Sequence, residues 1–140
     1  MDIGEALSTG LQIYGTLSEG QQAKEAGDYN ADVARSNAAY ALFESTANAA
    51  AQQRQSRQVI GEARAAYGAS GVTVEGSPID ILEQSAKMAE IDRQNILYAG
   101  NLRSKGYSKT ANLETSSGKN AQNAGYLKAG VELLASYFSS

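Results

Sequence analysis

The sequence predicts an all-α fold: a long antiparallel helical hairpin, flanked by amphipathic N- and C-terminal helices and completed by oligomerisation. Pro78 is the one proline among 140 residues, so almost nothing forbids long helices. Apolar residues recur at spacings of three and four, which places them on one helical face. Alanine supplies much of the 42% hydrophobic content, and the chain has no Trp and two Phe. Because Ala buries little area, we expect the helix faces to be buried against further copies of the chain.

The positions of the glycines divide the chain into four predicted segments. Residues 1–20 should form an amphipathic, glycine-rich helix, in which Leu7, Leu11 and Tyr14 share a face. Residues 21–110 should form the hairpin, with its turn at residues 68–77. Residues 111–120 contain a Ser-Ser-Gly run and are predicted to be a hinge. Residues 121–140 should form a second amphipathic helix, whose apolar stripe contains Leu127, Val131, Leu134 and Phe138.

Each arm of the predicted hairpin carries an apolar seam. The seam of the first arm has roughly heptad spacing and contains Ala26, Tyr29, Val33, Tyr40, Ala47 and Ile60. The seam of the second arm contains Ile79, Leu82, Ala86, Ala89, Ile96 and Ala99. Packing these two seams together would close the hairpin.

The turn has the most specific local pattern in the sequence. Gly68 and Gly71 are suited to the left-handed conformation that ends a helix, and Val72–Val74 is a short β-favouring piece between turn residues. Ser77 is predicted as the N-cap of the next helix, with Pro78 as its first residue and an acidic residue at the third position. The complete turn and capping motif is Gly68, Ser70, Gly71, Gly76, Ser77, Pro78 and Asp80.

The composition argues against catalysis. With no His and no Cys, the chain has no imidazole base, no thiol nucleophile and no zinc site of the usual kind. Acidic pairs such as Glu90 and Asp92 remain, but nothing in the pattern predicts a cleft, and a solvated helix face explains them. We therefore expect no enzymatic activity and no cofactor. A net charge of −3 without long basic runs also argues against sequence-independent binding to the nucleic-acid backbone, and we expect no specific nucleic-acid recognition.

The two terminal stripes allow two interpretations. They are contact surfaces either for the hairpin and neighbouring copies or for a lipid bilayer. Small residues such as Gly125, Ala129 and Gly130 would permit the close helix approach found in membrane helix pairs. Lys128 and Glu132 argue against a membrane-spanning helix, and the basic face typical of interfacial helices is missing. We therefore favour helix-on-helix docking and keep membrane contact as the alternative.

The middle of the chain resembles a known family. The similarity rests on Arg64–Val72 (RAAYGASGV) and Gly76–Leu82 (GSPIDIL), with further agreement at Asp92–Ile96 (DRQNI) and Gly106–Tyr107. These pieces resemble the small internal virion proteins of short-tailed bacteriophages, the inner-core or ejection proteins typified by the smallest core protein of the T7 group. The resemblance covers about Ala23 to Tyr107.

The resemblance implies a virion protein held inside the capsid near the portal, in a ring of copies, with the portal and larger core proteins as partners. It also implies expulsion during genome delivery and a contribution to a conduit through the host envelope, whose membrane would be a further partner. It supplies no catalytic residues. The chain departs from the family in its length, with one predicted helix after Gly106. The alternative is a non-viral helical adaptor or secretion-type assembly module without a membrane role.

Overall fold

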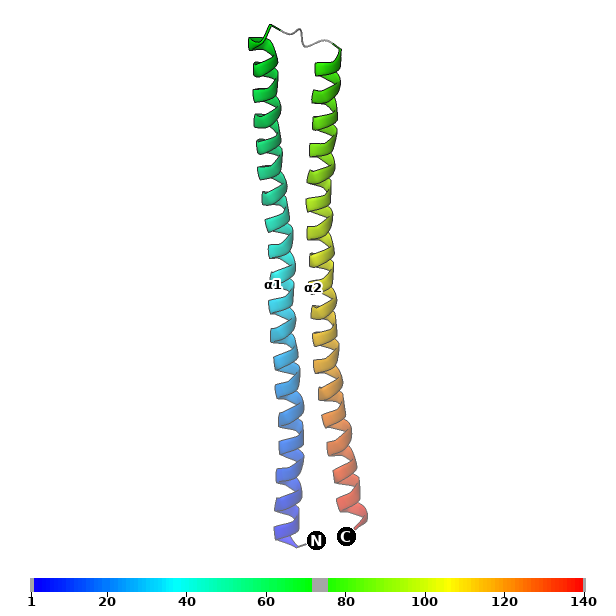
Figure 1. The fold of residues 1–140 in the computed structure, drawn as a ribbon. Coiled ribbons are helices and arrows are strands. Elements are labelled where there is room, and N and C mark those ends of the chain that lie inside the picture. Colours follow the sequence, from blue (N-terminus) through cyan, green and yellow to red (C-terminus); the bar gives the residue numbers. More distant parts are fainter. Residues whose placement is uncertain (1, 72–75, 140) are drawn as a thin grey trace. The chain divides into compact units, whose positions relative to one another are not determined.

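The computed structural model describes residues 2–71 and 76–139, and these residues form two helices that pack against each other (Figure 1). Helix α1 spans Ile3–Ala69, 67 residues, and α2 spans Ser77–Phe138, 62 residues. No strand occurs in the described parts of the chain. The prediction of an all-α fold is confirmed.

The helices continue through all three of the predicted segment boundaries. Helix α1 passes Gly20 without interruption, and α2 runs through residues 111–120, so the predicted hinge is wrong. The serines and glycine of this segment do lower its intrinsic helix propensity. However, Gly118 is buried and lies against the backbone of α1, so packing between the helices stabilises the helical conformation there.

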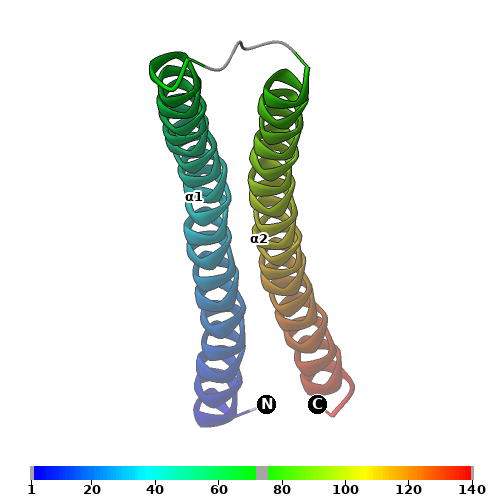
Figure 2. The ribbon, with the colours of Figure 1, turned by 45° about the horizontal axis from the view of Figure 1, so that its top comes forward.

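The contacts between α1 and α2 fall into two compact units. Unit 1 contains Met1–Ser36 and Tyr107–Ser140, and unit 2 contains Asn37–Gly106. In unit 1 the first part of α1 and the last part of α2, blue and red in Figure 1, lie side by side. In unit 2 the rest of α1 lies beside the first part of α2, and the end of α1 and the start of α2 are both green (Figure 2).

The interior of unit 1 consists of small residues. Ala31, Ala34 and Ala111 form a buried cluster with exposed fractions of 0–5%. The other buried positions are Gly20, Gly27, Gly118 and Ala129. In α1 these positions follow a seven-residue repeat, as in a coiled coil whose knobs have been reduced to methyl groups or hydrogen. Burying one methyl group contributes only about 0.8 kcal/mol, so this seam gains its contacts mainly through close backbone approach.

The interior of unit 2 also consists mainly of small residues. From α1 it buries Ala38, Ala41, Ser45 and Ala49, and from α2 it buries Leu82, Gly100 and Ser104. Leu82 is the one large hydrophobic residue that is buried within residues 2–71 and 76–139. Apart from Leu82, the buried residues in the described parts of the chain are alanines, glycines and serines.

The predicted seam of the first arm is wrong. Val33 and Tyr40 are 43% and 65% exposed, and the true seam passes through Ala34 and Ala41, each one residue later than these two. Both faces of α1 have heptad spacing, and the face with smaller residues allows the backbones to approach more closely. On the second arm the prediction is partly right, because Leu82 is buried, whereas Ala86 and Ala99 are exposed.

At the end of α1, one of the two predicted glycines has a left-handed backbone. Helix α1 ends at Ala69, and Gly71 adopts a φ of 73°, in the left-handed region predicted for it. Gly68 does not adopt this conformation, because the helix extends past it to Ala69. The predicted β-favouring piece, Val72–Val74, lies outside the described residues.

The start of α2 differs from its prediction by one residue. The carbonyl of Gly76 accepts the first helical hydrogen bond from the Asp80 amide at 3.2 Å, so Gly76 rather than Ser77 occupies the N-cap position. Gly76 has a φ of 81°, which favours glycine there. Ser77 and Pro78 then occupy the first two helical positions, where the missing amide of proline costs no helical hydrogen bond.

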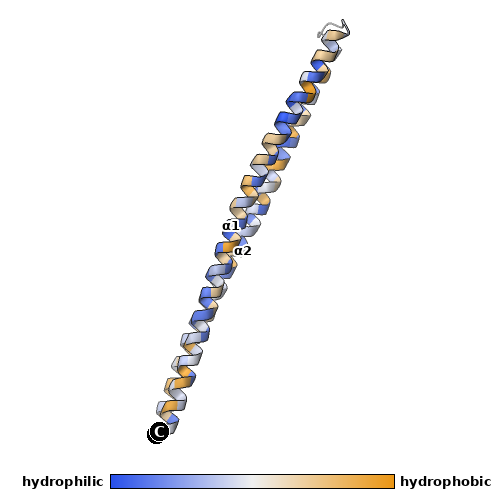
Figure 3. Ribbon diagram, turned by 90° about the vertical axis from the view of Figure 1, so that its left-hand side faces the viewer, coloured by the Kyte–Doolittle hydropathy of each residue, from blue (hydrophilic) through white to orange (hydrophobic). Residues whose placement is uncertain are grey.

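Polar and apolar residues are mixed along both helices (Figure 3). Within the described residues, no helical stretch combines the length and hydropathy needed to span a bilayer.

Candidate interaction surface

The N-terminal stripe lies on the outer face of α1 in unit 1. Leu7, Leu11 and Tyr14 are 64%, 72% and 73% exposed. The inner face is marked by Thr16 and Gly20, which contact the backbone region of α2. Since 3.6 residues complete a helical turn, the stripe points away from α2. Ile3, 79% exposed, extends the same face.

The C-terminal stripe lies on the outer face of α2 in the same unit. Leu127, Val131, Leu134 and Phe138 have exposed fractions between 60% and 82%. Ala129, buried between Leu127 and Val131 in sequence, lies on the side that faces α1. The stripe is therefore turned away from α1, and neither terminal stripe is covered within unit 1.

The two helices of unit 1 interlock through four glycines. An added Cβ at Gly27 would lie 2.6 Å from the carbonyl oxygen of Glu114 and 3.0 Å from Cα of Gly118. A Cβ at Gly118 or Gly125 would lie 3.2 Å or 3.1 Å from α1 backbone atoms, and one at Gly20 would lie 3.3 Å from α2. Glycines 20 and 27, like 118 and 125, are seven residues apart. This arrangement places backbone directly on backbone and leaves no room for bulky side chains between the helices.

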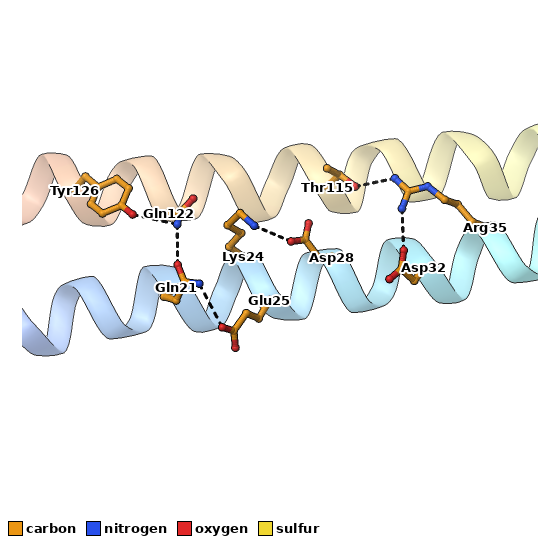
Figure 4. A network of polar contacts seen from close by, with 9 residues as sticks. All are labelled: Gln21, Lys24, Glu25, Asp28, Asp32, Arg35, Thr115, Gln122 and Tyr126. Carbon is orange, nitrogen blue, oxygen red and sulfur yellow. Dashed lines mark hydrogen bonds and ion pairs between the residues drawn. The ribbon is translucent and has the colours of Figure 1, made fainter.

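Polar side chains flank the interlock in unit 1 (Figure 4). The Gln122 amide donates to Gln21 Oε1 at 2.8 Å, and Arg35 donates to Asp32 at 3.0 Å and to Thr115 Oγ1 at 3.3 Å. Two of these bonds join α1 to α2. Because the side chains are solvent-exposed, we expect them to set helix register more than stability.

Ion pairs within each helix shift the pKa values of a few surface groups. In unit 1 the hydrogen bond from Lys24 to Asp28 raises the pKa of Lys24 and lowers the pKa of Asp28. In unit 2 hydrogen bonds from Arg93, and then from Gln94, lower the pKa of Glu90 to about 2. Glu90 is therefore ionised and bound to an arginine at neutral pH. This geometry stabilises the carboxylate and does not provide a general acid.

Unit 2 has an open groove where α1 and α2 are not in close contact. The groove has a volume of about 450 Å³ and apolar walls that include Val59, Ile60, Ile81 and Met88. Glutamine and serine side chains and Asp92 complete the lining. Ile60 also lines two smaller cavities of about 280 and 210 Å³. These side chains are larger than the glycines and alanines buried in unit 1, and Val59, Ile81 and Met88 are more than half exposed.

The turn and capping residues belong to unit 2, whereas both apolar stripes belong to unit 1, so the predicted site residues do not form one site. Ser70 donates from its hydroxyl to the Tyr67 carbonyl at 2.9 Å, a local bond that closes the end of α1. In the parts of the chain that the structure describes, no group of three or more acidic side chains is placed to hold a metal ion.

Sequence reasoning missed the residues that join the helices. Their signal is a seven-residue repeat of small side chains, which is visible at Gly20, Gly27, Ala34 and Ala41. A search limited to bulky apolar residues passes over such a repeat, because alanine and glycine contribute little to any hydrophobic periodicity.

No protein-family model, curated protein or solved structure matches this chain. The similarity to inner-core proteins at Arg64–Val72 and Gly76–Leu82 therefore stays a prediction. The function has to be inferred from the surfaces of the chain itself.

Proposed function

We propose that this chain is a structural assembly protein, which folds as an antiparallel helical hairpin and completes its hydrophobic burial in a homo-oligomer. The hairpin is supported by contacts in which the α2 partner moves backwards as α1 advances: Thr16 lies against Gly125, and Gly27 lies against Gly118 and Glu114. The oligomer is supported by the distribution of side chains. Across the described residues, 25 large hydrophobic side chains are exposed and one is buried.

The main support for the proposed oligomer is the solvent-accessible surface area of the chain. The chain exposes 9861 Å² of accessible surface. A folded monomer of its mass, 14.7 kDa, exposes about 6,900 Å² according to the scaling of surface with mass. The excess of about 2,900 Å² is of the size that subunits bury in obligate oligomers.

The biological setting we propose is a bacteriophage virion. The protein would form a ring inside the capsid near the portal, contact portal and larger core proteins, and act as a conduit component when the genome is delivered across the host envelope. The support is the resemblance at Arg64–Val72 and Gly76–Leu82, together with a surface suited to many lateral contacts. An adaptor without a delivery role would use the same surface, and vesicle leakage separates the two, because an adaptor should leave vesicles intact.

Sedimentation equilibrium over a hundredfold concentration range tests the assembly proposal. We expect a defined multimer that dissociates only at low concentration. A chain that stays monomeric and folded at the highest concentration would contradict it. An image of the particle that places the chain away from the portal axis would contradict the proposed setting and leave the assembly proposal intact.

A further inference from the structure

The two apolar stripes of unit 1 face opposite directions. Helices α1 and α2 contact each other through Gly20, Gly27, Gly118 and Gly125, and each stripe lies on the far side of its own helix. One partner therefore cannot cover both stripes. A copy that buries both must contact two neighbours.

The spacing within each stripe indicates that its occupant is another helix. Leu7, Leu11 and Tyr14 are separated by four and three residues, and the stripe that begins at Leu127 and ends at Phe138 steps by four, three and four. This is the spacing of a coiled-coil seam. A membrane-surface helix would instead carry a polar face rich in lysine and arginine, and residues 2–23 contain no basic side chain.

The α1 and α2 segments that carry the two stripes have net charges of opposite sign. Residues 2–23 carry three acidic and no basic side chains, whereas residues 107–139 carry three basic and two acidic ones. The N-terminal segment of α1 would therefore repel a second copy of itself and attract this segment of α2. Unit 1 holds half of the residues, so about half of the excess surface falls to it. Shared between two faces, this is about 725 Å² per face, or about 1,450 Å² counted on both partners, which is the size of a standard interface.

From these observations we propose that the outer face of α1 in one copy, centred on Leu7, Leu11 and Tyr14, packs against the outer face of α2 in the next copy, centred on Leu127, Val131 and Leu134. The contact is heterologous, so repetition closes into a ring or continues as an open array and does not stop at a dimer. This inference rests on the proposed assembly function and names the surfaces that would perform it.

The test uses two variants of the full chain, each lacking one face. The first is Leu7→Gln with Leu11→Gln, and the second is Leu127→Gln with Leu134→Gln. All four positions are at least 60% exposed, so the contacts between α1 and α2 should survive, and circular dichroism checks that they do. Leu133→Gln is the matched control, because Leu133 is 55% exposed on α2 but lies off the stripe.

Native mass spectrometry and light scattering give the readout. We expect a multimer larger than a dimer for the wild type and the control, a monomer for each variant alone, and a 1:1 dimer when the two variants are mixed. A variant that dimerises alone, or a mixture that stays monomeric, would overturn the heterologous pairing. Multimers that persist in both variants would overturn the choice of faces but not the assembly function, whereas a monomeric wild type would overturn both. Flotation of the monomeric wild type with phosphatidylglycerol vesicles would identify the stripes as lipid-binding surfaces and would also overturn the pairing.

Discussion

Gly27→Ala provides the most direct test of the glycine interlock. Its new methyl carbon would lie 2.6 Å from the Glu114 carbonyl oxygen, a backbone atom that cannot rotate away. The helices would have to separate by several tenths of an ångström, and a gap of about 0.5–1 Å already forfeits a quarter to a half of the dispersion energy of each contact it opens. Overpacking of this kind costs about 1–3 kcal/mol.

Gly15→Ala is the matched control in the same helix and the same unit. Nothing lies within 4 Å of a Cβ at Gly15, so the substitution only raises helix propensity, by about 1 kcal/mol. Gly27→Ala gains the same propensity and carries the steric cost in addition. The free energy of unfolding should therefore differ between the two variants by about 1–3 kcal/mol, with Gly15→Ala the more stable.

Urea denaturation followed by far-UV circular dichroism, at one fixed protein concentration, measures this difference. A fixed concentration is needed because self-association would add its own stabilisation. If both alanine variants were stabilised equally, the close approach of α1 and α2 at Gly27 would be refuted. Gly61→Ala, also with open space around its Cβ, checks that the gain at Gly15 reflects helix propensity.

Three further predictions test other parts of the molecule. A Cβ at Gly100 would overlap the Ser45 side chain, so Gly100→Ala should lower the urea midpoint, and adding Ser45→Gly should restore part of it, with a coupling of about 0.5–3 kcal/mol. Gly71→Ala should destabilise by about 1–2 kcal/mol in the same assay, because alanine disfavours the φ of 73° found there. The Glu90 carboxyl should titrate by NMR at its lowered pKa of about 2, and Arg93→Gln should return the midpoint towards 4.5. Since this pKa is depressed in the folded chain, the stabilisation by the ion pair is complete above pH 4.5 and is lost as the pH falls towards 2.

The fold class and the position of the turn could be predicted because they depend on local chemistry. Pro78 is compatible with helix only in a first turn, and the helix formers on both sides leave few alternatives. The first residue of α2, Ser77, lies one position from its predicted place because Gly76 takes the cap. Errors of this size are expected wherever a serine and a glycine compete for one N-cap.

The helix contact could not be predicted in the same way, because it depends on the distance between the backbones. Tyr29 and Tyr40 make one face of α1 more hydrophobic. Ala34 and Ala41 have small side chains, so their face of α1 allows a closer approach of α2. Periodicity detects the first property, whereas the packing of two long helices uses the second. Helix α2 continues through Gly118 for the same reason. Glycine weakens an isolated helix, but here it lets α2 approach α1 closely, and this close packing stabilises the helix.

The sequence predicts which residues form the candidate surface, but not how these residues are oriented relative to the contact between α1 and α2. Leu11 and Leu134 were expected to contact other molecules, and both are exposed. That they belong to stripes on opposite sides of unit 1 follows only once the seam between α1 and α2 is known. The orientation of each stripe is measured from this seam, so an error of one residue in the seam turns the expected surface by about 100°.

Most buried residues are small, and most large apolar residues are exposed. We therefore predict that the folding of one chain and the assembly of several chains can be disrupted separately. If the outer stripes bind neighbouring copies, each tenfold rise in protein concentration above the dissociation constant should stabilise the folded chain by about 1.4 kcal/mol per contact. The urea midpoint of the wild type and of Gly27→Ala should therefore rise with concentration, the second from a lower starting value. The midpoint of Leu127→Gln with Leu134→Gln should not change with concentration, because an exposed stripe contributes nothing within one chain. A wild-type midpoint that is independent of concentration would mean that the seam of alanines and glycines supplies all the stability, and the large outer residues would then have no part in folding.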